Sequence, residues 1–145
     1  MNTGESERRV REERLIYLMR HGETDWNKER RLQRQSDFTL HECGMELAVK
    51  TVEALADVPF DIAFCSPLGR AEETARIILG DRKTPLHRDI RLMEIHFGTS
   101  EGICFDAAKQ NQEDSLHDFF CIPESYLPPE GTESFVQVAM VYFEM

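Results

Sequence analysis

Short apolar runs bounded by polar residues or glycine mark the chain at three places. The run "RLIYLM" at residues 14–19 is too short for a helix and is followed closely by Gly22, so it predicts a strand buried on both faces. The run "FDIAFCS" at residues 60–66 predicts a second strand, and "RDIRLMEI" at residues 88–95 predicts a third. The spacing between these runs leaves room for a helix between consecutive strands.

Helical periodicity fills those intervals. After Gly44, apolar residues recur on one helical face and predict a helix that ends near residues 57–59; they are Met45, Ala48, Val52 and Leu55. Ser66 and Pro67 are typical of a helix start, as N-cap and first helical residue. The helix "RAEETARIIL" at residues 70–79 follows and is expected to end at Gly80.

The pattern is weaker beyond the third strand. Residues 97–102, "FGTSEG", predict a turn-rich loop, residues 114–121 predict a helical turn or two, and residues 123–131 predict a proline-rich loop. Residues 132–145 predict an amphipathic helix whose apolar face holds Phe135, Val138, Ala139, Tyr142 and Phe143. The alternation of strands and helices indicates an α/β layered fold with a largely parallel sheet.

Length and composition favour one globular domain with a polar leader. A chain of 145 residues is the size of a single domain. Residues 1–13 mix charges of both signs with one apolar residue, which predicts a disordered leader. The sequence contains no apolar run of the roughly 20 residues that a membrane span needs, and no signal peptide is recognisable. We therefore expect a cytoplasmic protein.

Charge and cysteine content exclude several classes of function. The formal net charge of −10 argues against nucleic acid or an anionic membrane as the main partner, because both would be repelled. The four cysteines are widely spaced and form no C-x-x-C pair, which argues against a zinc site or a disulfide framework. An acidic protein still binds phosphate if a few arginines converge locally.

The chemistry-bearing residues follow the predicted strands. Arg20 and His21 end the first strand, Arg70 comes soon after the second, and Glu94 lies at the end of the third. Since the carboxyl ends of parallel strands meet at one edge of a sheet, we expect these four side chains to converge there. Guanidinium groups match phosphate oxygens, a neutral imidazole is a nucleophile near pH 7, and a carboxylic acid protonates a leaving oxygen. Taken singly, each residue is more often an ordinary polar side chain, so the argument for phosphoryl transfer rests on the set.

The order of several motifs resembles a known family. "RHGETDWN", "SDFTLHECGMELA", "FCSPLGRAEETARIIL", "LMEIHFGTSEG" and "PPEGTESF" are similar, in order and approximate spacing, to the blocks of the histidine phosphatase superfamily, also called phosphoglycerate mutase-like. The resemblance covers nearly the whole chain after the leader. It implies a three-layer α/β/α fold with a largely parallel sheet, and a histidine phosphatase domain at residues 14–145.

The resemblance also implies roles for individual residues. His21 would be the nucleophile that becomes phosphohistidine, Arg20 and Arg70 would clamp the phosphoryl group, and Asn27 would add a hydrogen bond. Glu94 matches the family's proton donor. The implied activity is hydrolysis of a small phosphorylated substrate, a phosphomonoester, with no metal or cofactor. Mutase-type phosphoryl transfer remains an alternative.

Two departures from the family pattern stand out. Arg34 occupies a position where family members commonly have glycine, and we expect its side chain to point outward. The family's second catalytic histidine, in an S-H-G block, has no counterpart in this sequence, and His96 is the first candidate to compensate. We therefore expect a domain that lacks its C-terminal part, including a strand between the first and second strands. A phosphate-binding pseudo-enzyme or an inactive fragment is the corresponding alternative function.

Overall fold

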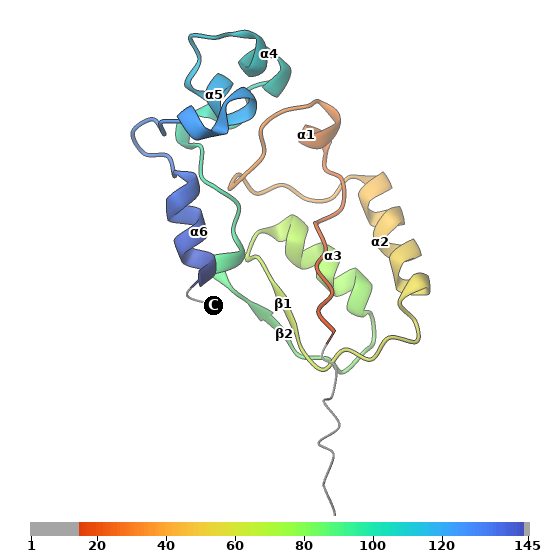
Figure 1. Ribbon diagram of the computed structural model, residues 1–145. Coiled ribbons are helices and arrows are strands. Elements are labelled where there is room, and N and C mark those ends of the chain that lie inside the picture. Colours follow the sequence, from red (N-terminus) through yellow and green to blue (C-terminus); the bar gives the residue numbers. More distant parts are fainter. Residues whose placement is uncertain (1–14, 144–145) are drawn as a thin grey trace, which may run out of the picture.

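Six α-helices and a two-stranded parallel sheet form the described part of the molecule (Figure 1). The computed structural model describes residues 15–143, so the predicted leader at residues 1–13 lies outside the described residues. The α-helices and strands are α1 (Asp25–Lys28), α2 (Glu42–Ala54), β1 (Ala63–Cys65), α3 (Gly69–Leu79), β2 (Leu86–Arg88), α4 (Phe105–Gln110), α5 (Ser115–Cys121) and α6 (Phe135–Phe143). Three 3₁₀ turns are η1 (Ile90–Leu92), η2 (Gly98–Ser100) and η3 (Pro123–Ser125). None of the helices in this described part is long and apolar enough to cross a membrane.

The sheet confirms the expected parallel pairing. β1 pairs with β2 in parallel, in the register Ala63 with Leu86, Phe64 with His87 and Cys65 with Arg88. Helix α3 forms the crossover between the two strands and packs against both α2 and β1. The β1–α3–β2 unit is therefore the α/β element that the alternating pattern predicts.

The first predicted strand, residues 14–19, is not a strand in the structure. The described residues of this run form an extended segment without ladder bonds, and the exposed fractions of Ile16 and Leu18 are 92% and 93%. Tyr17 makes one lateral contact, edge-on to the ring of Phe60 at 5.4 Å between centroids. The prediction is wrong because a strand needs a hydrogen-bonded neighbour, and no described strand pairs with this segment.

The prediction of a third strand at residues 88–95 is also wrong over most of that range. The strand lies earlier, at Leu86–Arg88, and the chain then enters the 3₁₀ turn η1. Asp89 stops the strand, because its carboxylate accepts a hydrogen bond from the Arg91 backbone N–H at 2.9 Å and pairs with the Arg91 guanidinium. The hydrogen bonds from Arg91 lower the pKa of Asp89 to about 2. Glu94 therefore lies in the irregular segment after η1.

Helix α3 starts later than the Ser66-Pro67 signal predicts. The helix begins at Gly69, and Ser66 does not cap it; its hydroxyl accepts instead from the Leu68 N–H at 3.4 Å. The Gly69 N–H donates to the carboxylate of Asp37 at 2.7 Å, so a residue from a distant loop caps the helix. The predicted end at Gly80 is confirmed, with φ of +53°.

An aromatic cluster from α4, α5, α6 and the segment around Phe97 forms the main core. Phe97 is fully buried and meets Phe119 edge-on at 4.7 Å, and Phe119 stacks on Phe135 at 4.8 Å. The predicted helices over residues 114–121 and 132–145 are confirmed as α5 and α6. On α6, Phe135 and Val138 face the cluster as predicted and Ala139 is exposed, while the side chains of residues 142 and 143 lie outside the described ones.

Candidate active site

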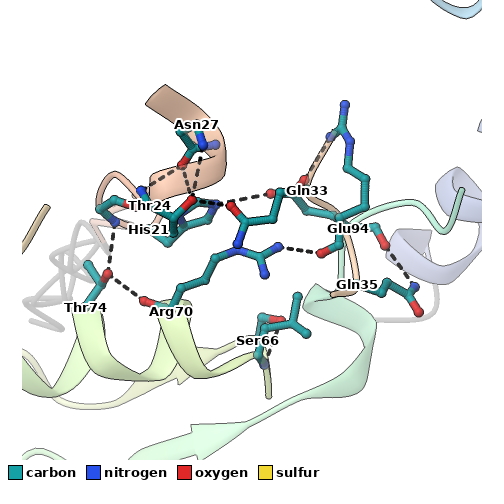
Figure 2. Close-up of polar contacts among 12 residues, drawn as sticks. His21, Thr24, Asn27, Gln33, Gln35, Ser66, Arg70, Thr74 and Glu94 are labelled. Atoms are coloured by element: carbon teal, nitrogen blue, oxygen red, sulfur yellow. Dashed lines mark hydrogen bonds and ion pairs between the residues drawn. The ribbon is translucent and has the colours of Figure 1, made fainter. Parts of the chain in front are cut away.

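His21 presents one ring nitrogen to the site and fixes the other. Nδ1 lies 2.6 Å from the carbonyl oxygen of Gly22, and because a carbonyl only accepts, Nδ1 carries the proton. Nε2 is buried, has no hydrogen-bond partner among the described residues, and lies 3.6 Å from Oε1 of Glu94 (Figure 2). In this tautomer the lone pair of His21 lies at Nε2, on the side of Glu94.

Helix α3 holds the His21 loop in place. The Gly22 N–H donates to the Thr74 hydroxyl at 3.0 Å, and this hydroxyl donates to the Arg70 carbonyl at 2.7 Å (Figure 2). On the opposite side, Gly22 meets Gly44 of α2 so closely that a Cβ on Gly22 would lie 2.8 Å from the Gly44 carbonyl oxygen. Sequence reasoning missed Thr74, although its spacing of four from Arg70 places both on one helical face.

Arg70 is the most deeply buried charged side chain of the site. Its side chain is fully buried, and its guanidinium donates to the backbone carbonyls of Ser36, at 2.9 Å, and of Arg34. Burial lowers the pKa of Arg70, while the charges of Glu94 and Asp37 act in the opposite direction. The buried Nε–H of Arg70 has no partner in the described part of the chain.

Glu94 is ionised and paired, and its partner corrects one expectation. Arg34 does not point outward, because its guanidinium donates to Oε2 of Glu94 at 2.8 Å. The loop that carries Arg34 also binds the Glu94 backbone, through Gln35 Nε2 at 3.0 Å from the Glu94 carbonyl. Burial raises the pKa of Glu94, but the close contact with His21 and the charges of Arg34 and Arg20 outweigh it and hold this pKa at about 2.

The loop between residues 33 and 36 is itself fastened to Glu101. The Glu101 carboxylate accepts from the backbone N–H groups of Gln35, at 3.0 Å, and of Ser36, at 2.7 Å. Burial raises the pKa of Glu101, but these hydrogen bonds, together with that of the Ser36 hydroxyl, lower it overall. Nothing in the sequence pattern marks Glu101 for this function, because its partners are backbone groups 65 and 66 residues away.

Asn27 and Arg20 complete the predicted set. The Asn27 side-chain oxygen accepts hydrogen bonds from the backbone N–H and the hydroxyl of Thr24, the residue that caps α1. These contacts use only the oxygen of the Asn27 amide, so its N–H groups are available to a ligand. The Thr24 hydroxyl also contacts Oε1 of buried Gln33. Arg20 is exposed and lies near enough to Arg70 for its charge to lower the Arg70 pKa. The predicted convergence of Arg20, His21, Arg70 and Glu94 is thus observed.

A cavity of about 450 Å³ opens beside His21. Its walls combine basic, polar and aromatic side chains, namely Arg20, His21, Glu23, Asn27, Arg31, Leu32, Gln33, Arg34, Phe105, Lys109 and Phe120. Arg70 and Glu94 are not in the wall but contact the wall residues Arg34 and His21. An acidic protein thus concentrates four cationic side chains around one cavity.

His96 does not substitute for the family's second histidine. Its Nδ1 lies 3.0 Å from the Gly131 carbonyl oxygen, and its backbone N–H donates to Glu133 at 2.7 Å. The cavity wall contains one histidine, His21, among the residues that the structure describes. Residues 15–143 also contain no cluster of three or more His, Cys, Asp or Glu that could hold a metal ion.

Comparisons with known proteins agree with this geometry. The model of the "Histidine phosphatase superfamily (branch 1)" matches residues 16–140. The chain is 38% identical to the "Probable 2-carboxy-D-arabinitol-1-phosphatase" of Arabidopsis thaliana over 108 residues, 68% of this chain and 22% of that protein. It is also 38% identical to the "Probable phosphoglycerate mutase GpmB" of Enterobacter sp. (strain 638) over 98 residues, 68% of this chain and 46% of that protein.

A solved structure extends the agreement to three dimensions. YhfR of Bacillus stearothermophilus superposes with a TM-score of 0.78 at 38% identity, covering 86% of this chain and 61% of that one. The expected α/β fold of the phosphoglycerate mutase type is therefore confirmed. The chain spans less than half the length of these two curated relatives and about three fifths of the solved chain. Because the family model matches residues 16–140, most of the chain, this chain belongs to the histidine phosphatase superfamily, branch 1, a family of phosphoryl-transfer enzymes.

Proposed function

We propose that this chain hydrolyses small phosphomonoesters through a phosphohistidine formed on Nε2 of His21. The observation that carries the proposal is the unpartnered, buried Nε2 atom, held beside a basic cavity with Glu94 at 3.6 Å. The Gly22 carbonyl keeps the proton on Nδ1, so the lone pair lies on the nitrogen that faces the site. This is the arrangement that nucleophilic catalysis by histidine requires.

The arginines would bind and stabilise the transferred phosphoryl group. Arg70 has one buried N–H without a partner among the described residues, and its guanidinium is held rigidly by two carbonyls. Arg20 and Asn27 line the cavity on the side of His21. Preorganised donors of this kind stabilise the charge that develops on the equatorial oxygens, because they need no reorganisation during the reaction.

The reaction divides into two balanced steps. In the first, Nε2 of His21 forms a bond to phosphorus, the ester P–O bond breaks, and the leaving oxygen takes a proton from Glu94, which must first have taken up that proton from solvent. In the second, water attacks phosphorus, the P–N bond breaks, and the Glu94 carboxylate takes the proton of the water. These steps use side chains alone, so we expect turnover to be unaffected by a chelator. Transfer of the phosphoryl group to a second substrate hydroxyl instead of water would give mutase-type activity.

The experiment is turnover and trapping with a generic aryl phosphate. The chain should hydrolyse p-nitrophenyl phosphate and accumulate a phosphoenzyme that is stable to base and labile to acid, as a P–N bond is. His21→Ala should abolish both signals. His117→Ala is the matched control, because His117 is bonded to the Lys109 carbonyl and does not line the cavity. An acid-stable phosphoenzyme, or one that survives in His21→Ala, would contradict the proposal.

A second function, phosphate binding without turnover, is favoured by one observation. Among the described residues the cavity contains a single histidine, whereas the family pattern has two. Loss of one preorganised donor at such a site commonly costs about 10²–10³ in rate. Binding of vanadate or sulfate by the wild-type chain, with no measurable phosphoenzyme, would support this second function.

A further inference from the structure

Arg34 connects three parts of the site. Its backbone carbonyl accepts from Arg70, and its guanidinium pairs with Glu94 at 2.8 Å. The same guanidinium lies over the rings of Phe97, at 5.2 Å, and Phe119, at 5.8 Å. Arg34 also lines the cavity in which His21 lies. One side chain therefore belongs both to the ligand cavity and to the ion pair of the candidate proton donor.

The backbone of Arg34 is held by Arg70, whereas among the described residues its guanidinium contacts side chains only. The hydrogen bond from Arg70 involves the Arg34 carbonyl and not its side chain, and φ at Arg34 is not positive, so arginine here causes no backbone strain. The side chain is about a quarter exposed, at 26%. A change of partner by the guanidinium would therefore cost no main-chain contact.

The charges around Glu94 depend on this partner. The groups that face the Glu94 carboxylate are His21, Arg34, Arg20 and Arg70. Burial alone would raise the pKa of Glu94, and the close contact with His21 and the charge of Arg34 are the first two influences that lower it. In the free site Glu94 is ionised, so it has no proton to donate, and it neutralises a guanidinium that borders the cavity.

A bound phosphoryl group would compete for the same guanidinium. A dianion in the cavity offers Arg34 two negative charges where Glu94 offers one, and guanidinium pairs with phosphate oxygens as well as with carboxylates. The pKa of a carboxyl group beside a new dianion rises, because like charges disfavour the ionised form. One proton from solvent would then bind to Glu94.

We propose that Arg34 is a displaceable positioning residue: it holds the Glu94 carboxylate in the free site, and a phosphomonoester dianion draws it away, so that Glu94 takes up a proton only when the cavity is occupied. The proton then passes from Glu94 to the leaving oxygen as the P–O bond breaks and the P–Nε2 bond forms. This inference rests on the proposed function and adds a substrate-dependent step to it. The expected consequence is that binding of the substrate itself causes the protonation of Glu94, the general acid.

The test is the titration of the Glu94 carboxyl, followed by NMR of its side-chain carbon in the wild-type chain. Sulfate is the probe, because it is dianionic in the range where the carboxyl of the bound state should titrate, and it contributes no proton of its own there. Saturating sulfate should raise the midpoint of the Glu94 titration by about 3–5 pH units, because a smaller rise from a pKa of about 2 would leave the carboxyl ionised at neutral pH. At a pH between the free and the bound Glu94 midpoints, calorimetry in two buffers of different ionisation enthalpy should show proton uptake on sulfate binding. Glu94→Gln should remove this uptake.

Two arginine variants separate positioning from general charge. Arg34→Met removes the guanidinium but keeps the carbonyl that Arg70 contacts, so the fold should be retained in a thermal melt. It should raise the Glu94 midpoint of the free protein by about one pH unit. Arg31→Met is the matched control, because Arg31 lines the same cavity but pairs with Glu29 at 2.6 Å. That variant should weaken sulfate binding and leave the Glu94 titration unchanged.

The outcomes distinguish this inference from the proposed function. Sulfate binding with an unmoved Glu94 midpoint would overturn the displacement alone. An unmoved midpoint in free, folded Arg34→Met would overturn the positioning role. Absence of any sulfate, phosphate or vanadate binding would overturn the proposed function and the displacement together. A raised midpoint in both experiments supports the inference whether or not the chain turns over substrate.

Discussion

The sheet half and the aromatic half of this molecule differ in how far their apolar side chains are exposed to solvent. The sheet half, defined as residues 15–19 with β1, β2, α2 and α3, exposes Ile16, Leu18 and Phe64 to solvent. The aromatic half, defined as residues 95–97 with α4, α5 and α6, buries Phe97 completely. Both halves contain apolar runs, and the difference lies in what covers them. An apolar side chain contributes to a core only when another element removes it from water.

The candidate active site lies between the two halves and draws on both. The sheet half supplies Arg70 on α3, His21 closely follows its segment 15–19, and the segment that leads into the aromatic half supplies Glu94. Arg34 bridges them, with its carbonyl on Arg70 and its guanidinium on Glu94 and over Phe97. The site therefore depends on the contact between the halves, and the following predictions test how unequal those halves are.

The largest expected effect is the loss of the Phe97 side chain. Phe97→Ala should lower the free energy of unfolding by about 3–5 kcal/mol, because it opens a cavity in the main core. Phe64→Ala, the same substitution at a half-exposed position of β1, is the matched control and should cost less than about 1 kcal/mol. Urea unfolding of both variants measures the difference. Equal losses would show that the sheet half is as well buried as the aromatic half.

A smaller but substantial effect is expected for Arg70. Arg70→Met leaves the carbonyls of Ser36 and Arg34 without a donor, and each unsatisfied buried group costs about 1–3 kcal/mol. Arg76→Met, on the same helix, is the control; it removes only a surface pair with Glu72 and should cost much less stability. Urea unfolding again provides the measurement. If the two variants were equally stable, the link between the halves through Arg70 would be unimportant.

Glu94 should contribute to the loss of folding stability at acid pH. Its pKa of about 2 in the folded state lies below the ordinary value near 4.3 in an unfolded chain. The stabilisation is therefore present above pH 4.3 and disappears as the pH falls toward 2. Thermal melts between pH 7 and pH 2.5 should show that Glu94→Gln flattens this fall. The same slope in the variant would mean that Glu94 is not held ionised by His21 and Arg34.

The smallest effect on stability is expected in the exposed segment. Leu18→Lys should change the free energy of unfolding by less than about 0.5 kcal/mol, because Leu18 is 93% exposed. The same variant should reduce self-association in light scattering, since exposed apolar segments without a paired neighbour promote edge-to-edge contacts. A loss of about 2 kcal/mol or more would instead show that this segment is paired and buried in solution.

Much of the local structure was predictable because its signals are local. The helices α2, α3, α5 and α6 follow from apolar spacing and from Gly80, and β1 from its apolar run. Two strands were mispredicted for different physical reasons. Residues 14–19 have the composition of a strand, but pairing depends on a neighbour, and Asp89 ends β2 through a side-chain contact that composition does not reveal.

The amino-acid sequence by itself determined the family, the helix positions and the residue types at the site, because these follow from motif order and from periodicity within one segment. The tertiary structure alone decided which partner each group has. Arg34 pairs with Glu94 60 residues away, and Thr74 holds Gly22 52 residues away. Contacts over such separations depend on how the chain packs in space, and a one-dimensional pattern contains no distance between them. That is why the sequence predicts His21 and Glu94 together but not the pairing of Arg34 with Glu94.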